Sequence, residues 1–385
     1  MVLSTAVALL LASGAVLALP SETPDATPMI DGRVRAIEQV GTNIWLGGRF
    51  SQVERRDGTV LGNVGNLAVF NSQTDRYRRG VAPDLGDPGA EVFDMTTYRG
   101  DVLIAGNFSG PTGSKENLVL VDGATGDVIR WYDAPTLKSV LAAPGLGKVY
   151  GGGVSLSAFG FATGERLWTR AKTSVDAVRA HDSKPAYRDL ELDADGKTIW
   201  AACICDRVNG NPAKAMVKLS TGGRHFTSWL TQAGTGSFGQ SVVDHNGKLF
   251  LAAGGSDFVA EFDKAKGGSR GWKQDTSGSA QAVAVYDGQL VVGGHFYYVG
   301  DDRADACGAG RPGDPQLDPN GQCKRRQGIA AYSFGGRLDP DWNPAYSGSY
   351  SLVWEVHAEG KRLHTGGQFK RVNGVVQNSY ARLSP

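Results

Sequence analysis

Residues 281–296 read QAVAVYDGQLVVGGHF, and this stretch decides the fold. Its first part alternates valine with smaller or polar residues, and a period of two is typical of a β-strand. The pair Asp287-Gly288 follows, and such pairs favour tight hairpin turns because both turn positions need a positive φ. A second apolar segment then ends in Gly293 and Gly294. The stretch predicts a β-hairpin whose second strand carries two adjacent small residues.

The second half of this hairpin recurs along the chain. It reads WLGGRF from Trp45, LIAGNF from Leu103, VYGGGV from Val149, WAACIC from Trp200, FLAAGG from Phe250, VVGGHF from Val291 and HTGGQF from His364. The first small residue of each copy lies at positions 47, 105, 151, 202, 252, 293 and 366, so the average repeat is about 53 residues. Repeats of this length are typical of β-propeller blades.

Each repeat also contains a third apolar strand, a second turn and a fourth strand that ends at tryptophan. The tryptophans are Trp131, Trp168, Trp229, Trp272 and Trp342. No helical period follows the N-terminal stretch, so the chain is predicted to be all-β, as a single β-propeller of seven four-stranded blades. We expect the paired small residues to let neighbouring sheets approach each other. We expect the tryptophans to pack between the blades.

The last repeat stops at Leu383, after its third strand. We predict that the N-terminal segment, residues 19–32, supplies the missing outer strand and closes the propeller formed by residues 33–385. Closure of this kind leaves fewer exposed sheet edges.

The repeats carry the pattern GGxF…V-N-G…(L/A)-x-x-(L/F)…T-G…W-x-P. The best copies are GGQFKRVNG from Gly366 and LDPDWNP from Leu338. This pattern resembles the delta-60 repeat of secreted bacterial β-propellers, which are common in actinobacteria. The third and fifth copies depart from it, because they lack the phenylalanine and most of the loop. The resemblance spans residues 33–385. It implies a propeller scaffold in an exported protein and no catalytic residue, because the family motif is structural.

The N-terminus predicts export. Residues 2–19 are almost wholly apolar, and Val16 and Ala18 have the spacing of a signal-peptide cleavage site, so residues 1–18 are predicted to be a signal peptide. The alternative is an uncleaved membrane anchor. After cleavage we expect a secreted, extracellular protein with no membrane segment.

The four cysteines follow the signal peptide, and an even number in an exported chain favours disulfides. Cys307 and Cys323 bracket a loop rich in Gly, Pro and Asp, and we predict that they form a disulfide. Cys203 and Cys205 lie two residues apart in a predicted strand, so their side chains leave the same face. A tight disulfide and two thiols remain open for this pair.

Charge excludes some partners. The chain has 40 Lys and Arg against 39 Asp and Glu, so no overall field favours nucleic acid or an anionic membrane. We expect a monomer that binds an extracellular glycan, an anionic polymer or a surface protein. No nucleophile elbow, zinc-protease motif or Walker loop occurs. No catalytic residue is therefore assigned, although His295, Glu355 and His357 lie on or beside predicted inner strands.

The predicted loops after the second strands are basic. Their cations are Arg55, Arg56, Lys324, Arg325, Arg326, Lys370 and Arg371. These loops belong to repeats six, seven and one, which are consecutive in a closed ring. Guanidinium groups suit carboxylates and phosphates, so this sector is a candidate anion-binding site. The alternative is a solvated rim whose charges are offset by neighbouring aspartates.

No cofactor is predicted. Five aspartates in the sixth repeat could offer oxygen ligands to calcium, but their spacing matches no EF-hand loop. They are Asp301, Asp302, Asp305, Asp314 and Asp318. The sequence thus favours a secreted, non-catalytic binding module for an anionic cell-surface polymer or glycan. The alternative is an exported lyase or hydrolase that acts on polysaccharides at the channel mouth.

Overall fold

The computed structural model describes residues 19–85, 89–110, 116–176, 184–234, 236–300, 323–349 and 352–385. Over these residues the protein is all-β, as predicted, and consists of many small antiparallel sheets. A single turn of 3-10 helix (Pro144–Leu146) interrupts the strands described there. No helix in these ranges has the length and apolar character that a membrane span requires.

Seven main sheets follow one another along the chain. The first sheet contains β2 (Arg33–Val40), β3 (Asn43–Arg49) and β6 (Leu67–Asn71). The second contains β7 (Glu91–Tyr98), β8 (Asp101–Asn107), β9 (Leu118–Asp122) and β10 (Val128–Tyr132). The third contains β11 (Ser139–Ala143), β12 (Lys148–Gly152), β13 (Leu156–Gly160) and β14 (Arg166–Arg170). The next two contain β16 (Ala186–Leu192), β17 (Thr198–Ile204) and β20 (Met216–Ser220); and β21 (Phe238–His245), β22 (Lys248–Gly254), β23 (Phe258–Asp263) and β24 (Arg270–Asp275). The last two contain β25 (Ala280–Tyr286), β26 (Gln289–Gly294) and β29 (Ile329–Tyr332); and β31 (Val353–Glu359), β32 (Arg362–Gly367) and β35 (Tyr380–Leu383).

Four smaller sheets form where a second main strand is followed by a long connection. The first contains β1 (Met29–Ile30), β4 (Gln52–Glu54) and β5 (Val60–Asn63), and the second contains β15 (Thr173–Ser174), β18 (Arg207–Val208) and β19 (Asn211–Pro212). The third pairs β27 (Tyr298–Val299) with β28 (Lys324–Arg325). The fourth contains β30 (Tyr346–Ser347), β33 (Arg371–Val372) and β34 (Val375–Val376). In three of them, the segment that enters a unit pairs with the hairpin that follows the second strand of that unit. Much of what the sequence presents as loops is therefore hydrogen-bonded structure.

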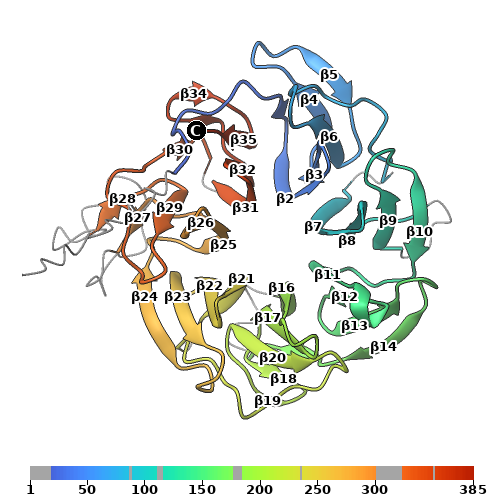
Figure 1. The fold of residues 1–385 in the computed structure, drawn as a ribbon, viewed down its shortest axis with the longest axis vertical. Helices are drawn as coiled ribbons and strands as arrows, with labels where there is room; N and C mark the ends of the chain where they lie inside the picture. The colour runs from blue at the N-terminus through green and yellow to red at the C-terminus, as the bar shows by residue number, and fades with distance from the viewer. Residues whose placement is uncertain are drawn as a thin grey trace, which may run out of the picture.

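The innermost strands of the seven main sheets stand around a common centre (Figure 1). Along the chain, β2 contacts β7, β7 contacts β11, β11 contacts β16, β16 contacts β21, β21 contacts β25 and β25 contacts β31. The series ends with a contact between β31 and β2. The first and last main sheets are thus neighbours in space.

Neighbouring sheets pack closely at the paired small residues. A Cβ atom at Gly293 would lie 2.6 Å from Cγ1 of Val353 in the next sheet, and one at Gly366 would lie 2.7 Å from Cγ1 of Val34 in the first sheet. Both distances are shorter than a normal contact between carbon atoms. The glycines therefore allow an approach that any side chain would prevent.

The hydrophobic core lies between the sheets. One buried cluster joins Tyr150 of β12 to Ile199 of β17, and another joins Val291 of β26 to Leu363 of β32. Each cluster takes residues from two neighbouring sheets, so each sheet is stabilised on both of its faces by hydrophobic burial.

Four of the main sheets have three strands among the described residues, where four strands were predicted for most of them. In three of these sheets the fourth segment makes only one bridge, namely Phe70–Tyr77, Leu219–His225 and Tyr332–Leu338. A turn follows each bridge and ends the pairing. In the sixth unit, for example, Oδ1 of Asp339 accepts the N–H groups of Asp341 and Trp342.

Two of the recurring tryptophans, Trp229 and Trp272, form hydrogen bonds with the next unit. The Nε1 atom of Trp229 donates to the carbonyl of Lys264 (3.2 Å), and that of Trp272 donates to the carbonyl of Phe334 (2.9 Å). Both acceptors belong to the turn that precedes the fourth segment of the following unit. The indole rings thus connect neighbouring units, as the sequence led us to expect.

The N-terminal segment lies beside β35. The N–H groups of Ser21, Asp25 and Ile30 donate to the carbonyls of Ser384, Arg382 and Asn378, respectively. The order of these pairs is antiparallel. The N-terminal segment therefore connects the two ends of the described chain, and Figure 1 shows it crossing near β35 and β34.

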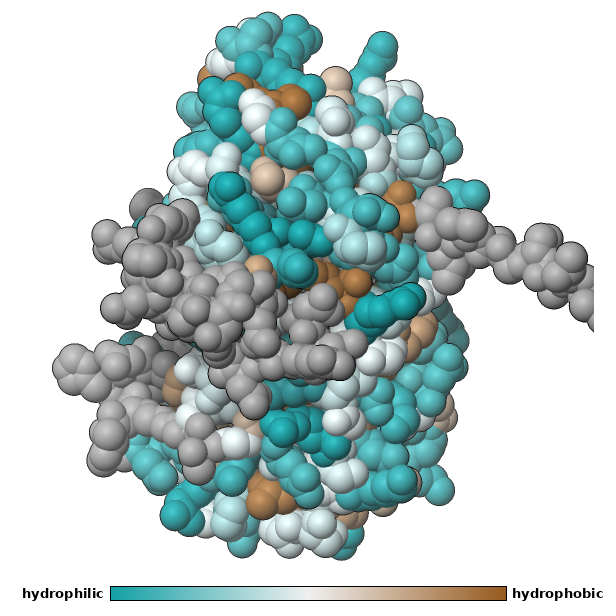
Figure 2. Space-filling model, turned by 90° about the vertical axis from the view of Figure 1, so that its left-hand side faces the viewer, coloured by the Kyte–Doolittle hydropathy of each residue, from teal (hydrophilic) through white to brown (hydrophobic). Residues whose placement is uncertain are grey.

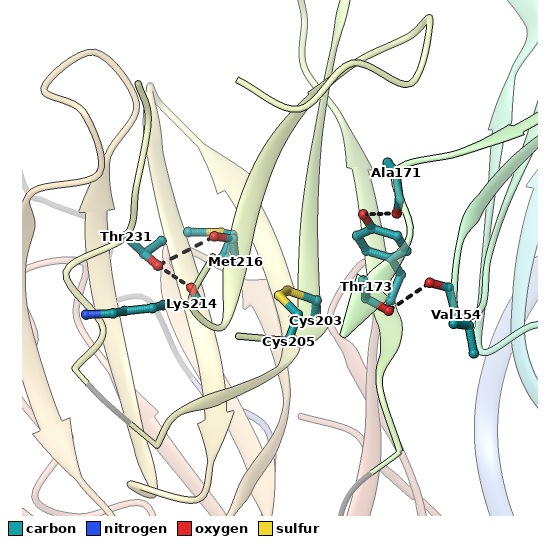
Figure 3. The surroundings of a disulfide bond; sticks show 9 residues. Val154, Ala171, Thr173, Cys203, Cys205, Lys214, Met216 and Thr231 are labelled. Atoms are coloured by element: carbon teal, nitrogen blue, oxygen red, sulfur yellow. Dashed lines mark hydrogen bonds between the residues drawn. A yellow bond between two sulfur atoms is a disulfide. The ribbon is translucent and has the colours of Figure 1, made fainter. Parts of the chain in front are cut away.

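Cys203 and Cys205 form a disulfide at the end of β17, and both residues are fully buried (Figure 3). Figure 3 also shows two backbone carbonyls beside it that accept side-chain hydrogen bonds, from Thr173 to Val154 and from Thr231 to Lys214. Of the two alternatives for this pair, the structure thus contains the disulfide. The predicted signal peptide, Cys307 and the five loop aspartates lie outside the described residues, so the Cys307–Cys323 bridge stays a prediction.

The side of the molecule that carries β24, β27 and β28 is shown in Figure 2. The described surface there is mostly hydrophilic, and hydrophobic residues form small separate groups.

Substituting Gly366 by alanine should destabilise the protein, because the new methyl group would collide with Val34. Overpacking of this kind costs about 1–3 kcal/mol, so we expect the free energy of unfolding in urea to fall by that amount. Gly145→Ala is the matched control, because nothing lies within 4 Å of a Cβ atom built there. Equal stability of the two variants would contradict the close approach of the last sheet to the first.

Candidate functional site

A pocket of about 480 Å³ lies between the innermost strands, and residues of β2, β7, β16, β21, β25 and β31 line it together with residues at the start of β11. We call it the axial pocket. The strands that supply these residues stand around a common centre (Figure 1). A concave site that gathers polar side chains from several elements is the usual form of a ligand site.

Six innermost strands contain a β-bulge at the same place, and the bulged residues line this pocket. In each of these strands the pairing with the second strand skips one residue near the start. The skipped residues are Arg35, Phe93, Arg188, Gln240, Gln281 and Trp354, and all of them line the pocket. Lys138, which precedes β11 directly, lines it from the remaining unit. A bulge changes the direction of the extra residue's side chain. Here the bulges place one side chain from each of six units at an equivalent position in the pocket.

The residue after the bulge connects neighbouring sheets. Asp94 accepts the N–H of Val140 in the next sheet (2.7 Å), and Asp189 accepts the N–H of Val242 in the next sheet (2.8 Å). The second carboxylate oxygen of each aspartate accepts the N–H of the residue that follows it. The repetition of this arrangement indicates a structural role, because the same bridge satisfies an equivalent backbone donor at two interfaces.

Cations and aromatic rings alternate at the level of the bulges. The guanidinium carbon of Arg35 lies 4.0 Å from the ring centroid of Trp354, and Nζ of Lys138 lies 3.0 Å from that of Phe93. Nε of Arg188 donates to Oε1 of Gln240 (3.1 Å). Cations over aromatic faces gain electrostatic attraction without losing their charge. This level, which we call the mouth layer, therefore presents Arg35, Lys138 and Arg188 beside two aromatic rings.

Glu91, Asp94 and Asp189 offset part of this charge, since each raises the pKa of Arg188. Glu91 forms ion pairs with both Arg35 and Arg33. The side chain of Lys138 has no ion pair among the residues described by the structure. Burial and then Arg188 lower the pKa of Lys138 to about 7, and burial and then Arg35 lower the pKa of Arg188 to about 10. Cations whose pKa is lowered by burial and by a neighbouring cation favour the binding of an anion.

Carboxyl groups also line the axial pocket. Burial and then Asp94 raise the pKa of Glu38 to about 8, while burial and then Asp189 raise the pKa of Glu191 to about 8. Glu355 is raised well above its ordinary pKa by burial and by neighbouring carboxylates. The pocket thus combines cations and aromatic rings with carboxyl groups that keep their protons near neutral pH.

The three inner-strand residues noted in the sequence fall at or beside this pocket. Glu355 and His357 line it, and the His295 ring lies edge-on to Trp354 with 4.6 Å between centroids. Burial lowers the pKa of both His295 and His357 to about 4, so both rings are neutral at physiological pH. Neither ring adds positive charge to the mouth layer.

The predicted basic sector is distributed over three hairpins, namely β4–β5, β27–β28 and β33–β34 (Figure 1). Lys324 and Arg325 are exposed on β28. Arg371 braces its own hairpin by donating to the carbonyl of Gly374 (2.8 Å), and Lys370 donates to Oδ1 of Asn378 (3.1 Å).

Two other members of this sector, Arg56 and Arg326, donate hydrogen bonds to distant parts of the chain. Arg326 is 6% exposed, and its guanidinium donates to the carbonyls of Asp339 and Pro340. Arg56 donates to Oε1 of Gln377 (2.9 Å) and to the carbonyl of Pro24 (3.1 Å). Arg55 and Arg56 also line a separate groove, which is analysed below.

The mouth layer was not predicted, although the sequence contains a signal for it. When the repeats are aligned on their small residues, the inward residue lies twelve positions before the first small residue in five units. A bulge hides this column from a search for strict alternation, because the extra residue shifts the pattern by one. Alignment of the repeats, rather than periodicity within one strand, would have found it.

Comparison with known proteins supports the fold alone. No protein-family model matches the sequence, and no curated protein matches it. A similar solved structure is the crystal structure of the computationally designed Ika8 protein, with a TM-score of 0.52 and 10% sequence identity. The match covers 94% of this chain and 100% of that one.

Stability should fall as the pH rises from 5 to 8, in part because of Glu38. The folded protein keeps a proton on Glu38 up to about pH 8, whereas the unfolded chain releases it near the ordinary carboxyl pKa of 4.5. The contribution of this group is therefore present at low pH and is lost as the pH rises, by up to about 1.4 kcal/mol per pH unit. Glu38→Gln should be more stable than the unmodified protein at pH 8 and about equally stable at pH 5.

Urea unfolding at both pH values measures this difference. Glu165→Gln, at an exposed turn, is the matched control and should leave the pH dependence unchanged. An unchanged pH dependence in Glu38→Gln as well would contradict a proton held at Glu38.

Proposed function

We propose that the chain is a single seven-bladed β-propeller, in which each main sheet is one blade and residues 33–385 form the ring. The cyclic order of contacts from β2 to β31 and back to β2 supports this proposal. The small residues on the second strands support it as well, because they admit the next sheet at equivalent places.

We further propose that residues 19–32 complete the last blade. The tryptophan bonds give a specific argument. Trp229 and Trp272 each donate to the turn before the fourth segment of the next unit. Trp342 donates instead to the carbonyl of Pro20 (2.9 Å), in the N-terminal segment. This bond supports a role for the segment as the outer part of the seventh unit.

Export is part of the same proposal. The buried Cys203–Cys205 disulfide supports it, because disulfides persist mainly in oxidising compartments. Intact-mass analysis of protein recovered from the culture medium should give a chain that begins at Leu19. A mature chain that retains residues 1–18 would contradict cleavage after Ala18.

We propose that the protein is a binding module whose axial pocket takes an acidic sugar or a similarly small ligand with an anionic group. The convergence of Arg35, Lys138 and Arg188 with the rings of Phe93 and Trp354 carries this proposal. The cations would hold a carboxylate or sulfate by charge-assisted hydrogen bonds, which are the strong ones. The rings would face the body of the sugar.

Isothermal titration with short uronic-acid and sulfated oligosaccharides, and with neutral oligosaccharides of equal length, tests the proposal. We expect binding of the acidic set only, and a 10- to 100-fold weaker affinity in Lys138→Ala, because a hydrogen bond to a charged group contributes about 1.5–3 kcal/mol. The affinity should fall between pH 6 and pH 8 as Lys138 loses its proton. Lys138→Arg should reduce that fall.

Lys172→Ala, which removes an exposed lysine away from the pocket, is the matched control and should bind normally. Equal affinity for acidic and neutral oligosaccharides, or no loss of affinity in Lys138→Ala, would sink the proposal.

A second candidate function is a hydrolase or lyase that acts on polysaccharides in the same pocket. The cluster of Glu38, Glu191 and Glu355 favours it, because a carboxyl that stays protonated near neutral pH can serve as a general acid. Chromatography of each ligand after incubation tests for cleavage. Products that disappear in Glu355→Gln would show catalysis, and unchanged ligands would leave the binding module.

A further inference from the structure

A second concave site lies at the outer side of the first unit. It is a groove of about 780 Å³ between the β4–β5 hairpin, the segment that follows β6, and N-terminal residues 26–28. Its charged and aromatic lining residues are Arg55, Arg56, Asp57, Asp75, Arg76, Tyr77 and Arg79. All of these residues belong to the described part of the chain. We call it the arginine groove.

The arginine groove assembles four guanidinium groups from two parts of the sequence. Arg55 and Arg56 follow β4, whereas Arg76 and Arg79 follow β6. From the sequence we predicted that Arg55 and Arg56 lie in one basic sector with the loops of the sixth and seventh units. The folded chain instead places them beside two arginines of their own unit.

Two of these groups are anchored by neutral acceptors. Arg56 donates to Oε1 of Gln377 and to the carbonyl of Pro24, and Arg79 donates to the carbonyl of Leu61. Amide and carbonyl oxygens fix the orientation of a guanidinium without neutralising its charge. Both groups are therefore preorganised cations, which lowers the entropy that binding must cost.

The other two groups, Arg55 and Arg76, are exposed, and their guanidiniums form no hydrogen bond or ion pair with residues of the described ranges. They remain available to a ligand. Forked guanidinium groups suit the planar or tetrahedral oxygen arrays of carboxylates and sulfates.

The acidic residues of the groove do not cancel this charge. The carboxylate of Asp75 receives both terminal nitrogens of Arg382, whose side chain is 9% exposed. Asp57 accepts the N–H of Thr59 (2.9 Å) and closes its own turn. Arg382 also pairs with Asp25, so the four arginines and Arg382 together make five cations against the three carboxylates of Asp25, Asp57 and Asp75, and positive charge remains in excess.

An aromatic ring lies in the same groove. Tyr77 is half-buried and packs edge-on against Phe70, with 6.1 Å between the ring centroids. A Cβ atom at Gly62 would lie 2.8 Å from its ring, so this glycine gives Tyr77 its place beside β5. An apolar ring with a hydroxyl among guanidiniums offers a surface for the body of a sugar as well as for its charges.

We propose that the arginine groove binds a polysaccharide that carries sulfate or carboxylate groups along its length. The groove is open and solvated, so each contact is weak and screened by salt. Binding therefore depends on several charges that engage one polymer at the same time. This site is separate from the axial pocket, and its test does not depend on the proposal made for that pocket.

Surface plasmon resonance with immobilised dextran sulfate, hyaluronan and uncharged dextran tests the proposal on the full mature chain. We expect retention on at least one charged polymer and none on dextran, with retention falling as NaCl rises from 50 to 500 mM. Arg55→Ala/Arg76→Ala should weaken binding about tenfold or more, since two charge-assisted contacts are removed. Because both side chains are exposed and unbonded, the thermal unfolding temperature should be unchanged.

Two control variants remove the same number of positive charges elsewhere. Lys266→Ala/Arg270→Ala changes exposed residues of the fifth unit, and Lys324→Ala/Arg325→Ala changes β28. Both should bind the polymer as the unmodified protein does. Retention on dextran sulfate alone identifies a sulfated ligand, and retention on hyaluronan as well extends it to carboxylates. Equal weakening by all three double variants, or equal retention on charged and uncharged dextran, would overturn the proposal.

Discussion

The close approach of each sheet to the next, at the small residues of the second strand, is the constraint on which the rest of the structure depends. A Cβ atom at Gly47 would lie 2.5 Å from Cγ1 of Val92, and Gly293 and Gly366 face Val353 and Val34 in the same way. These contacts bring the innermost strands near the centre, where the sheets have least room. Further outward, where the sheets diverge, the gap is filled by large rings such as Trp168 and Trp272. The order from small to large residues along the radius gives the units their wedge shape.

Six of the inner strands that stand around this centre contain bulges. Each bulge adds one residue without extending the sheet, and the added twist turns its side chain into the axial pocket. The next residue then becomes available to the neighbouring sheet, as Asp94 and Asp189 show by accepting N–H groups across the interface. A single irregularity therefore serves both the packing of the units and the lining of the pocket. Side chains fixed in this way are preorganised for a ligand, since their backbone is held from two sides.

Periodicity was sufficient to predict an all-β chain of repeated hairpins, because the alternation and the turn residues act locally. It was insufficient for the number of strands per unit, because single bridges such as Tyr332–Leu338 end in turns that bonds from distant residues stabilise, here those of Arg326 to the carbonyls of Asp339 and Pro340. The candidate sites depended even more on tertiary structure. Arg35, Lys138 and Arg188 are far apart in sequence and meet only at the centre, while Arg76 and Arg79 join Arg55 only because the chain turns after β6. Loop composition alone therefore pointed to charges such as Arg326, which is buried and bonded to main-chain carbonyls.

The two cationic sites differ in their surroundings, and this difference determines what each can recognise. In the axial pocket, burial lowers the pKa of Lys138 and Arg188, which shows that their charge lacks full solvation. An anion that enters there replaces missing water and gains strong, short-range contacts, but the carboxyls that also line the pocket keep their protons and offer no positive charge to a second anionic group. Such a pocket suits one anionic group on a small ligand. In the arginine groove the cations stay hydrated, so no single contact is strong and salt weakens all of them. Such a groove can retain only a ligand that offers many charges at once, which a small acidic sugar does not.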